Sequence, residues 1–241
     1  MDFVYIIGGL IGLIIGGEYL VRGAVALAQN LRISPMVIGL TLVGFGTSIP
    51  ELVTSVQAAL IGAPGIAVGN VVGSNIANIL LILGCAALIM PLTVPRRAFR
   101  RDGTVLIAAT GLCLGVVLLG TFGRLIGAGF LALLLGYLIM AIRSGDVVAE
   151  TDLPRATTAP LWPTLAMITG GLAVTVFAAK FLVQGAVAVA ADLGVSETVI
   201  GLTIVAIGTS MPELVTSVIA ARRGQVDVAL GNIIGSNIFN V

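Results

Sequence analysis

The sequence predicts an all-α, polytopic membrane protein built around an internal repeat, and three observations support this. Hydrophobic residues make up 58% of the 241-residue chain, charged residues only 10%, and the mean hydropathy is +1.17. The apolar residues form runs long enough to cross a bilayer. A 40-residue segment occurs twice. So few charges cannot cover a water-facing surface, and a net charge of +1 offers nothing to a polyanion, which argues against a soluble enzyme or a nucleic-acid binder.

Five apolar segments fill the first 142 residues and predict five transmembrane helices. They cover residues 3–29, 36–61, 66–90, 103–120 and 125–142. Glu18 and Arg22 interrupt the first segment and no small-residue cleavage site follows them, so we interpret it as a span rather than a signal peptide. A Gly-Ala-Pro-Gly turn separates the second and third segments, and the charged residues within 96–102 predict a loop before the fourth.

A polar stretch, residues 143–160, divides the chain into two parts. We expect residues 1–142 to form a first repeat and residues 161–241 to form a second. The second part contains apolar segments at 161–191 and 197–221, and another that begins near Asp227 and stops at Val241. The chain is therefore expected to hold about seven and a half spans, with the second repeat truncated in its eighth helix, as a fragment or as part of a longer protein.

The basic residues predict which way the spans cross the membrane. If the N-terminus lies outside, nine arginines fall in inner loops and only Arg124 in an outer one. Arg22 and Lys180 lie within spans and are not counted. Because inner loops are enriched in basic residues, an N-out topology with residues 143–160 in the cytoplasm is expected. A lipid-binding patch is the less favoured interpretation of the same arginines.

The repeated segment is the strongest signal in the sequence. Residues 39–78 align with residues 201–240 at an offset of 162 without gaps, and 25 of the 40 positions are identical. Five spans separate equivalent points, and an odd number inverts the second copy relative to the first. Inverted repeats with interrupted helices are typical of secondary transporters, whose substrate site lies near the middle of the membrane.

Each copy carries the motif GTSxPE inside an apolar segment, at residues 46–51 and 208–213. Proline lacks an N–H and clashes with the carbonyl one turn earlier, and the glycine four residues before it loosens the same turn. The helix is therefore expected to break there and to free carbonyl groups near Gly44 and Ala206. Such carbonyls are tolerated at membrane depth where they line a cavity or meet an ion.

Glu51 and Glu213 directly follow these breaks, and a carboxylate in hydrocarbon costs roughly 2.5–3.5 kcal/mol or more unless a cation, a proton or a partner compensates it. The two would give one site a charge of −2. Further oxygen atoms come from Thr47, Ser48, Ser74, Asn78, Thr209, Ser210, Ser236 and Asn240. Carboxylate, amide, hydroxyl and carbonyl oxygens suit hard cations such as Ca²⁺ and Na⁺. We expect no resident cofactor, since the ions would be cargo.

Some of these polar residues and glycines also have a structural interpretation that does not involve ion binding. A lone Ser or Asn in a membrane helix more often joins helices than binds an ion. Glycines 69, 73, 231 and 235 are expected to be packing notches. Glu18 and Arg22 stand four residues apart and are expected to pair on one helix. Lys180 aligns with Glu18 in the repeat, which raises a second option, that these two meet across the repeat axis.

GTSxPE followed by GNxxGSN, present twice, resembles the α-repeats of the cation/Ca²⁺ exchanger superfamily, in its prokaryotic sodium/calcium exchanger branch. The resemblance implies ten transmembrane helices in two inverted halves, Na⁺-driven Ca²⁺ transport by alternating access, and a location in a prokaryotic inner or plasma membrane. It makes Glu51 and Glu213 the central cation ligands, with the oxygens named above completing the shell. It also implies that residues 3–29 and 161–191 slide as a pair over the other helices.

Two points are left open by the motifs. Some members of the superfamily, including the potassium-dependent branch, carry Asp where Asn240 stands. Asn at this position therefore argues against K⁺ co-transport. Exchange of H⁺ for Ca²⁺ is the main alternative to Na⁺/Ca²⁺ exchange, and a passive cation channel is a more distant one. An enzyme is least expected, because no nucleophile–base set or nucleotide loop is present. We expect a monomer that binds ions and the lipid bilayer.

Overall fold

The computed structural model describes residues 2–94, 96–120, 122–143, 160–195, 204 and 206–241, and all regular structure in these ranges is helical. The first half contains α1 (Asp2–Leu31), α2 (Pro35–Ile38), the π-helix η1 (Gly39–Val43), α3 (Gly44–Thr47), α4 (Ile49–Leu60), α5 (Pro64–Ala77), the π-helix η2 (Asn78–Ile82), α6 (Leu83–Ile89), α7 (Arg96–Leu119) and α8 (Arg124–Arg143). The second half contains α9 (Leu161–Asp192), α11 (Ala206–Thr209), α12 (Met211–Arg222) and α13 (Val226–Asn240).

Within the described ranges, five helices are long and apolar enough to cross a membrane, and a bent pair makes a sixth. The five are Asp2–Leu31, Pro64–Ile89, Phe99–Leu119, Arg124–Arg143 and Leu161–Asp192. The bent pair joins Pro35–Thr47 to Ile49–Leu60 at an angle of 43°. These segments agree with the first six that the apolar runs predict. The seventh prediction, residues 197–221, lies partly outside the described residues, and the described part of the eighth, α13, is 15 residues long.

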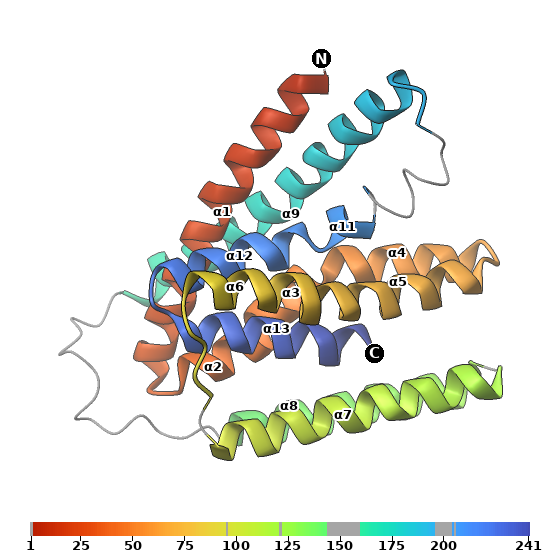
Figure 1. The fold of residues 1–241 in the computed structure, drawn as a ribbon. Coiled ribbons are helices and arrows are strands. Elements are labelled where there is room, and N and C mark those ends of the chain that lie inside the picture. The colour runs from red at the N-terminus through yellow and green to blue at the C-terminus, as the bar shows by residue number, and fades with distance from the viewer. Residues whose placement is uncertain (1, 95, 121, 144–159, 196–203, 205) are drawn as a thin grey trace.

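The two copies of the repeated segment form hairpins that point in opposite directions (Figure 1). The turn between α4 and α5 lies at one end of the molecule, and the turn between α12 and α13 lies at the other. Helix α13 packs against α2 and against η1 and α3 of the first copy, so the two hairpins are interlocked. The predicted inversion of the copies is therefore present in the fold.

Helices α1 and α9 form a pair that runs obliquely to the other helices (Figure 1). Small residues let their backbones approach closely, as is common between membrane helices. A methyl group added to Gly16 would lie 2.7 Å from the backbone N of Thr175, and one added to Gly171 would lie 2.6 Å from the backbone N of Leu20. Close backbone packing therefore holds the middle of the pair, and Tyr5 of α1 also stacks on Phe181 of α9 with ring centroids 5.7 Å apart.

Gly171→Val should weaken the α1–α9 pair, because its side chain has no room between the two backbones. Overpacking of this kind costs about 1–3 kcal/mol. Gly170→Val is the matched control, since an added Cβ at Gly170 meets no described atom within 4 Å and the loss of a helical glycine is the same. Thermal unfolding in detergent, followed by size-exclusion chromatography, should show a lower midpoint for Gly171→Val alone. Equal midpoints for the two variants would contradict the packing described for this pair.

The charged residues at 96–102 lie on the first two turns of α7, so the predicted loop there is wrong. A transmembrane helix can extend beyond the hydrocarbon, and Arg is a good helix former, so charge alone does not end a helix. Asp102 is fully buried and accepts hydrogen bonds from Arg101 Nε at 2.7 Å and from the Tyr137 hydroxyl of α8 at 3.1 Å. This contact joins α7 to α8 at the end of the pair where α7 begins.

The glycine prediction holds for the second copy. A Cβ on Gly231 would lie 2.7 Å from the backbone N of Leu40, and one on Gly235 would lie 2.9 Å from the Leu40 carbonyl carbon, so both glycines admit the first copy's backbone. For Gly69 and Gly73, no described atom lies within 4 Å. By the repeat offset their partners would fall within residues 198–202, which lie outside the described residues.

Candidate cation site

The helix breaks at both GTSxPE motifs, as the sequence predicts. Ser48, with φ −82° and ψ 4°, separates α3 from α4, and Ser210, with φ −90° and ψ 9°, separates α11 from α12. A proline stands in the first turn of each following helix, where its missing N–H costs nothing. Glu51 and Glu213 lie in the same first turns, where the positive end of the helix dipole favours a carboxylate.

Each hinge serine binds the glutamate of the other repeat. Ser48 Oγ donates to Glu213 Oε1 at 3.0 Å, and Ser210 Oγ donates to Glu51 Oε1 at 2.9 Å. Glu51 is 2% exposed and Glu213 is fully buried. The two carboxylates are therefore brought into one buried site by contacts that cross between the hairpins.

An asparagine in each copy fixes the turn that carries the glutamate. Asn70 Nδ2 donates to the Glu51 carbonyl at 3.1 Å and to Ser55 Oγ at 2.9 Å. Asn232 Nδ2 makes the equivalent bonds, to the Glu213 carbonyl at 3.3 Å and to Ser217 Oγ at 2.9 Å. These asparagines are not among the predicted site residues, although both are the first Asn of GNxxGSN and this repetition is a signal that points to them.

A second set of contacts joins Thr47 of the first copy to α13. Thr47 Oγ1 lies 3.0 Å from Asn232 Oδ1 and 3.4 Å from Ser236 Oγ, and all three side chains are fully buried. Ser236 Oγ also donates to the Gly44 carbonyl at 3.3 Å. That carbonyl accepts the backbone N–H of Ser48 at 3.2 Å as well, so the break does not free it as expected. The helical turn persists up to Thr47 because the backbone leaves helical geometry only at Ser48.

Several buried oxygen atoms at the site have no hydrogen-bond partner among the described residues. They are Glu51 Oε2, Glu213 Oε2, Ser74 Oγ and Asn78 Oδ1. Ser74 is 3% exposed and Asn78 is 1% exposed. Buried polar atoms are nearly always satisfied, so four such oxygens on these two motifs point to a ligand that donates to them or coordinates them. The chemistry of the set, carboxylate with amide and hydroxyl, fits Ca²⁺ or Na⁺.

Asn78 stands where the backbone widens. It begins the π-helix η2, and the other π-helix, η1, directly precedes α3 and the first hinge. Single turns of π-helix often occur at functional sites, because the extra residue redirects side chains and loosens the hydrogen-bond ladder. Neither π-helix is among the elements that the sequence predicts.

The remaining predicted ligands are placed less centrally. Thr209, at the end of α11, is half-buried, and Ala206 begins that helix. Asn240 is half-buried at the end of α13, and its Nδ2 has no partner among the described residues. The structure thus joins Thr47, Ser48, Glu51, Ser210, Glu213 and Ser236 by direct contacts between the two copies.

Comparison with known proteins agrees with this arrangement. The family model described as "Sodium/calcium exchanger protein" matches residues 1–143 and 163–241. CaxA of Alkalimonas amylolytica is 42% identical over 249 residues, which cover 99% of this chain and 77% of CaxA. Sodium/calcium exchanger MaX1 of Methanosarcina acetivorans is 34% identical over 287 residues, which cover all of this chain and 80% of MaX1. Inner membrane protein YrbG of Escherichia coli is 36% identical over 250 residues, 98% of this chain and 75% of YrbG.

A solved structure extends the similarity to the fold. The sodium-calcium exchanger NCX_Mj, soaked with Na⁺ and Sr²⁺, matches with a TM-score of 0.88 at 35% sequence identity, over 99% of this chain and 78% of that chain. The family match covers most of the chain, and the fold match covers nearly all of it. The chain is a multi-pass membrane protein of the transporter class, not an enzyme, and it belongs to the sodium/calcium exchanger family.

Proposed function

We propose that the protein is a secondary antiporter that exchanges Na⁺ for Ca²⁺ by alternating access at a site between its two repeats. The observation that carries the proposal is the pair of buried glutamates, each hydrogen-bonded through one oxygen to the other repeat and each left with one unpartnered oxygen. Among the described residues, neither carboxylate is paired with Arg or Lys. A proton or a cation from solution is the compensation that remains, and the surrounding hydroxyl and amide oxygens favour a metal cation.

The charge of the site explains why binding leads to exchange. Glu51 and Glu213 supply −2, and Asn78 and Asn240 supply neutral amide oxygens. One Ca²⁺ or two Na⁺ would balance this charge, so the two ions compete for the same carboxylates. A third Na⁺ would bind against a net positive site unless it occupies a place apart. Competition at one site that opens alternately to each side couples the two fluxes.

The ligand shell that we propose contains Glu51 and Glu213 at the centre. Around them lie Thr47, Ser48, Ser74, Asn78, Thr209, Ser210, Ser236 and Asn240, with the carbonyls of Gly44 and Ala206. Ser74 and Asn78 are supported by their unpartnered buried oxygens. Gly44 has weak support, because its carbonyl already accepts hydrogen bonds from Ser48 N, Ser236 Oγ and Thr47 Oγ1.

Vesicle transport by the full-length protein tests the proposal and separates it from exchange of H⁺. Purified protein in liposomes should take up ⁴⁵Ca²⁺ when an outward Na⁺ gradient is imposed, and a choline gradient of equal ionic strength is the control. Uptake driven by a pH gradient without Na⁺ would replace the proposal with H⁺/Ca²⁺ exchange. Single-channel currents would indicate a passive channel instead.

We also propose that the protein lies in a prokaryotic inner membrane with its N-terminus outside. The turn of residues 62–65 carries no charge, whereas α12 ends at Arg222 and is capped by Arg223 where the other hairpin turns, and basic turns favour the inner side. The opposite ends at which the two turns lie fit this assignment (Figure 1).

Cysteine labelling checks this orientation. With Cys85 and Cys113 replaced by serine, a cysteine at Ala63 should react with a membrane-impermeant maleimide from outside the cell. A cysteine at Gln225 should react only in inside-out vesicles, because its turn is at the opposite end of the fold. The reverse pattern would refute the N-out assignment, and labelling of both positions from one side would refute the inverted arrangement in the membrane.

A further inference from the structure

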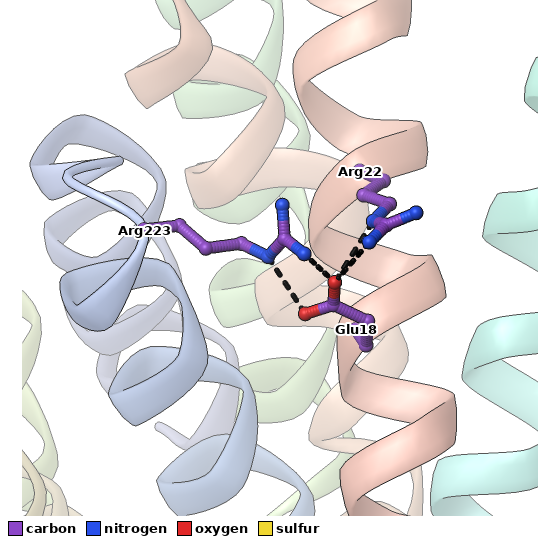
Figure 2. Close-up of polar contacts among 3 residues, drawn as sticks. All are labelled: Glu18, Arg22 and Arg223. Carbon is purple, nitrogen blue, oxygen red and sulfur yellow. Dashed lines mark hydrogen bonds and ion pairs between the residues drawn. The ribbon is translucent and has the colours of Figure 1, made fainter.

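An ion cluster joins the oblique helix α1 to the turn that follows α12 (Figure 2). Glu18 of α1 accepts a hydrogen bond from Arg22 Nε at 2.8 Å and another from Arg223 Nε at 2.7 Å. Arg223 Nη2 also pairs with Glu18 Oε1, so the guanidinium and the carboxylate meet in a two-pronged contact. The Glu18 side chain is 28% exposed and that of Arg223 37% exposed. Glu18 thus has two cationic partners, not the one that the sequence predicts.

The second option for Glu18, a contact with Lys180, is wrong. Lys180 is exposed on α9, and Glu18 faces the α12–α13 turn instead. Glu18 is directed toward Arg223 because α1 packs against α12 at this level, and this packing keeps Glu18 away from Lys180. At the neighbouring Gly17, an added Cβ would lie 2.8 Å from Ile219 Cδ1 of α12.

The two arginines belong to different parts of the molecule. Arg22 stands one turn after Glu18 on the same helix, so it moves with Glu18 whenever α1 moves. Arg223 caps α12, which belongs to the interlocked hairpins that carry the glutamate site. A cavity of about 210 Å³, lined by both arginines and by Val25, Gln29 and Gln225, lies beside the cluster and leaves space for the side chains to rearrange.

The repeat does not reproduce this cluster at the other end of the molecule. By the offset of 162, Glu18, Arg22 and Arg223 correspond to Lys180, Gln184 and Ile61. A lysine, an amide and an isoleucine cannot form a carboxylate–guanidinium contact. An inverted repeat with identical copies would make its two end states equal in energy, so a contact present at one end only must favour one of them.

We propose that the Glu18–Arg223 pair is a conformational latch that favours the state in which α1 lies against the α12–α13 turn, and that Arg22 keeps Glu18 compensated when the latch opens. The proposal rests on the alternating access proposed above. Without Arg22, opening would leave Glu18 without a cation in a partly buried place, which is costly. With Arg22 present, the Glu18 carboxylate loses Arg223 but keeps one arginine when the latch opens. The latch therefore shifts the equilibrium between the two positions of α1 without preventing its movement.

The latch is tested by a distance measurement that does not depend on transport. Spin labels at Ile14 of α1 and Leu60 at the end of α4, both exposed, report the position of α1 relative to the hairpins in the full-length protein, with Cys85 and Cys113 replaced by serine. Arg223→Gln should raise the population with α1 displaced by about two- to five-fold, the range expected for a partly exposed ion pair. Arg22→Gln should lower that population.

Arg222→Gln is the matched control, because it removes the same charge from the same turn and Arg222 makes no described contact with Glu18. A charge swap, Glu18→Arg with Arg223→Glu, should lower the displaced population to that of the wild type or below it, because the swapped pair can form again and Arg22 now repels the arginine at position 18 when the pair opens. Identical distributions for Arg223→Gln and Arg222→Gln would overturn the latch. If the labels respond as expected but the vesicles show no Na⁺-driven Ca²⁺ uptake, the proposed function fails while the latch stands.

Discussion

Glu51→Gln and Glu213→Gln should each abolish Ca²⁺ transport while leaving the protein folded. Each change removes half of the charge that faces the cation but keeps the shape of the side chain, and glutamine can still accept the hydrogen bond from the hinge serine. When the partner of a buried opposite charge is removed, the loss is about 3–5 kcal/mol. The opposite charge here is the bound Ca²⁺, so the affinity for Ca²⁺ should fall by at least about 100-fold.

Calorimetric titration of Ca²⁺ into the purified full-length protein measures this loss. Asp192→Asn is the matched control, because it removes one carboxylate from an exposed position at the end of α9. Size-exclusion profiles and thermal midpoints show whether each variant is folded. A folded Glu51→Gln or Glu213→Gln variant that binds Ca²⁺ as well as Asp192→Asn does would remove the glutamates from the centre of the site.

Asn232→Ala should produce the second-largest effect, although we do not place Asn232 among the ion ligands. Its amide holds the Glu213 carbonyl and Ser217, and its oxygen lies 3.0 Å from Thr47 of the other repeat. The change leaves several buried groups unsatisfied at about 1–3 kcal/mol each. We therefore expect Ca²⁺ affinity to fall about ten-fold or more, with a lower thermal midpoint.

Asn70→Ala is the internal comparison for this prediction. It removes the equivalent bonds of the first repeat, but Asn70 is half-buried whereas Asn232 is fully buried, so the groups that lose a partner are less deeply buried and the loss costs less. The loss of Ca²⁺ affinity should be clearly smaller than for Asn232→Ala. Equal effects in the two variants would show that burial does not set the cost of losing these contacts, and no effect in either would remove both asparagines from the support of the site.

The sequence predicts the hinges well because their cause is local. Proline and glycine act on the backbone of their own turn, so the break at Ser48 and its copy at Ser210 follow from the motif alone. The duplication then predicts that the two hinges meet, and the serine–glutamate contacts between the copies confirm it. Repetition thus supplied the long-range information that a single sequence normally lacks.

The features that sequence analysis missed depend on packing. Glu18 and Arg223 are 205 residues apart, and the repeat duplicates neither of them, so no local or repeated pattern predicts their contact. The charges at 96–102 predict a loop, but they lie on α7, where Asp102 is buried against Tyr137, and no local pattern shows that burial. The π-helices that begin at Gly39 and Asn78 have no amino-acid pattern that distinguishes them from α-helix, so the sequence does not predict them.

Competition between Na⁺ and Ca²⁺ for one pair of carboxylates is the central claim, and Ca²⁺ titration at increasing Na⁺ measures it most directly. The full-length protein should be titrated at constant ionic strength, with choline replacing Na⁺. Since two Na⁺ balance the charge that one Ca²⁺ balances, the logarithm of the apparent Kd should rise with the logarithm of Na⁺ concentration at a slope of about two or more. A Kd for Ca²⁺ that stays constant as choline is replaced by Na⁺ would contradict the account.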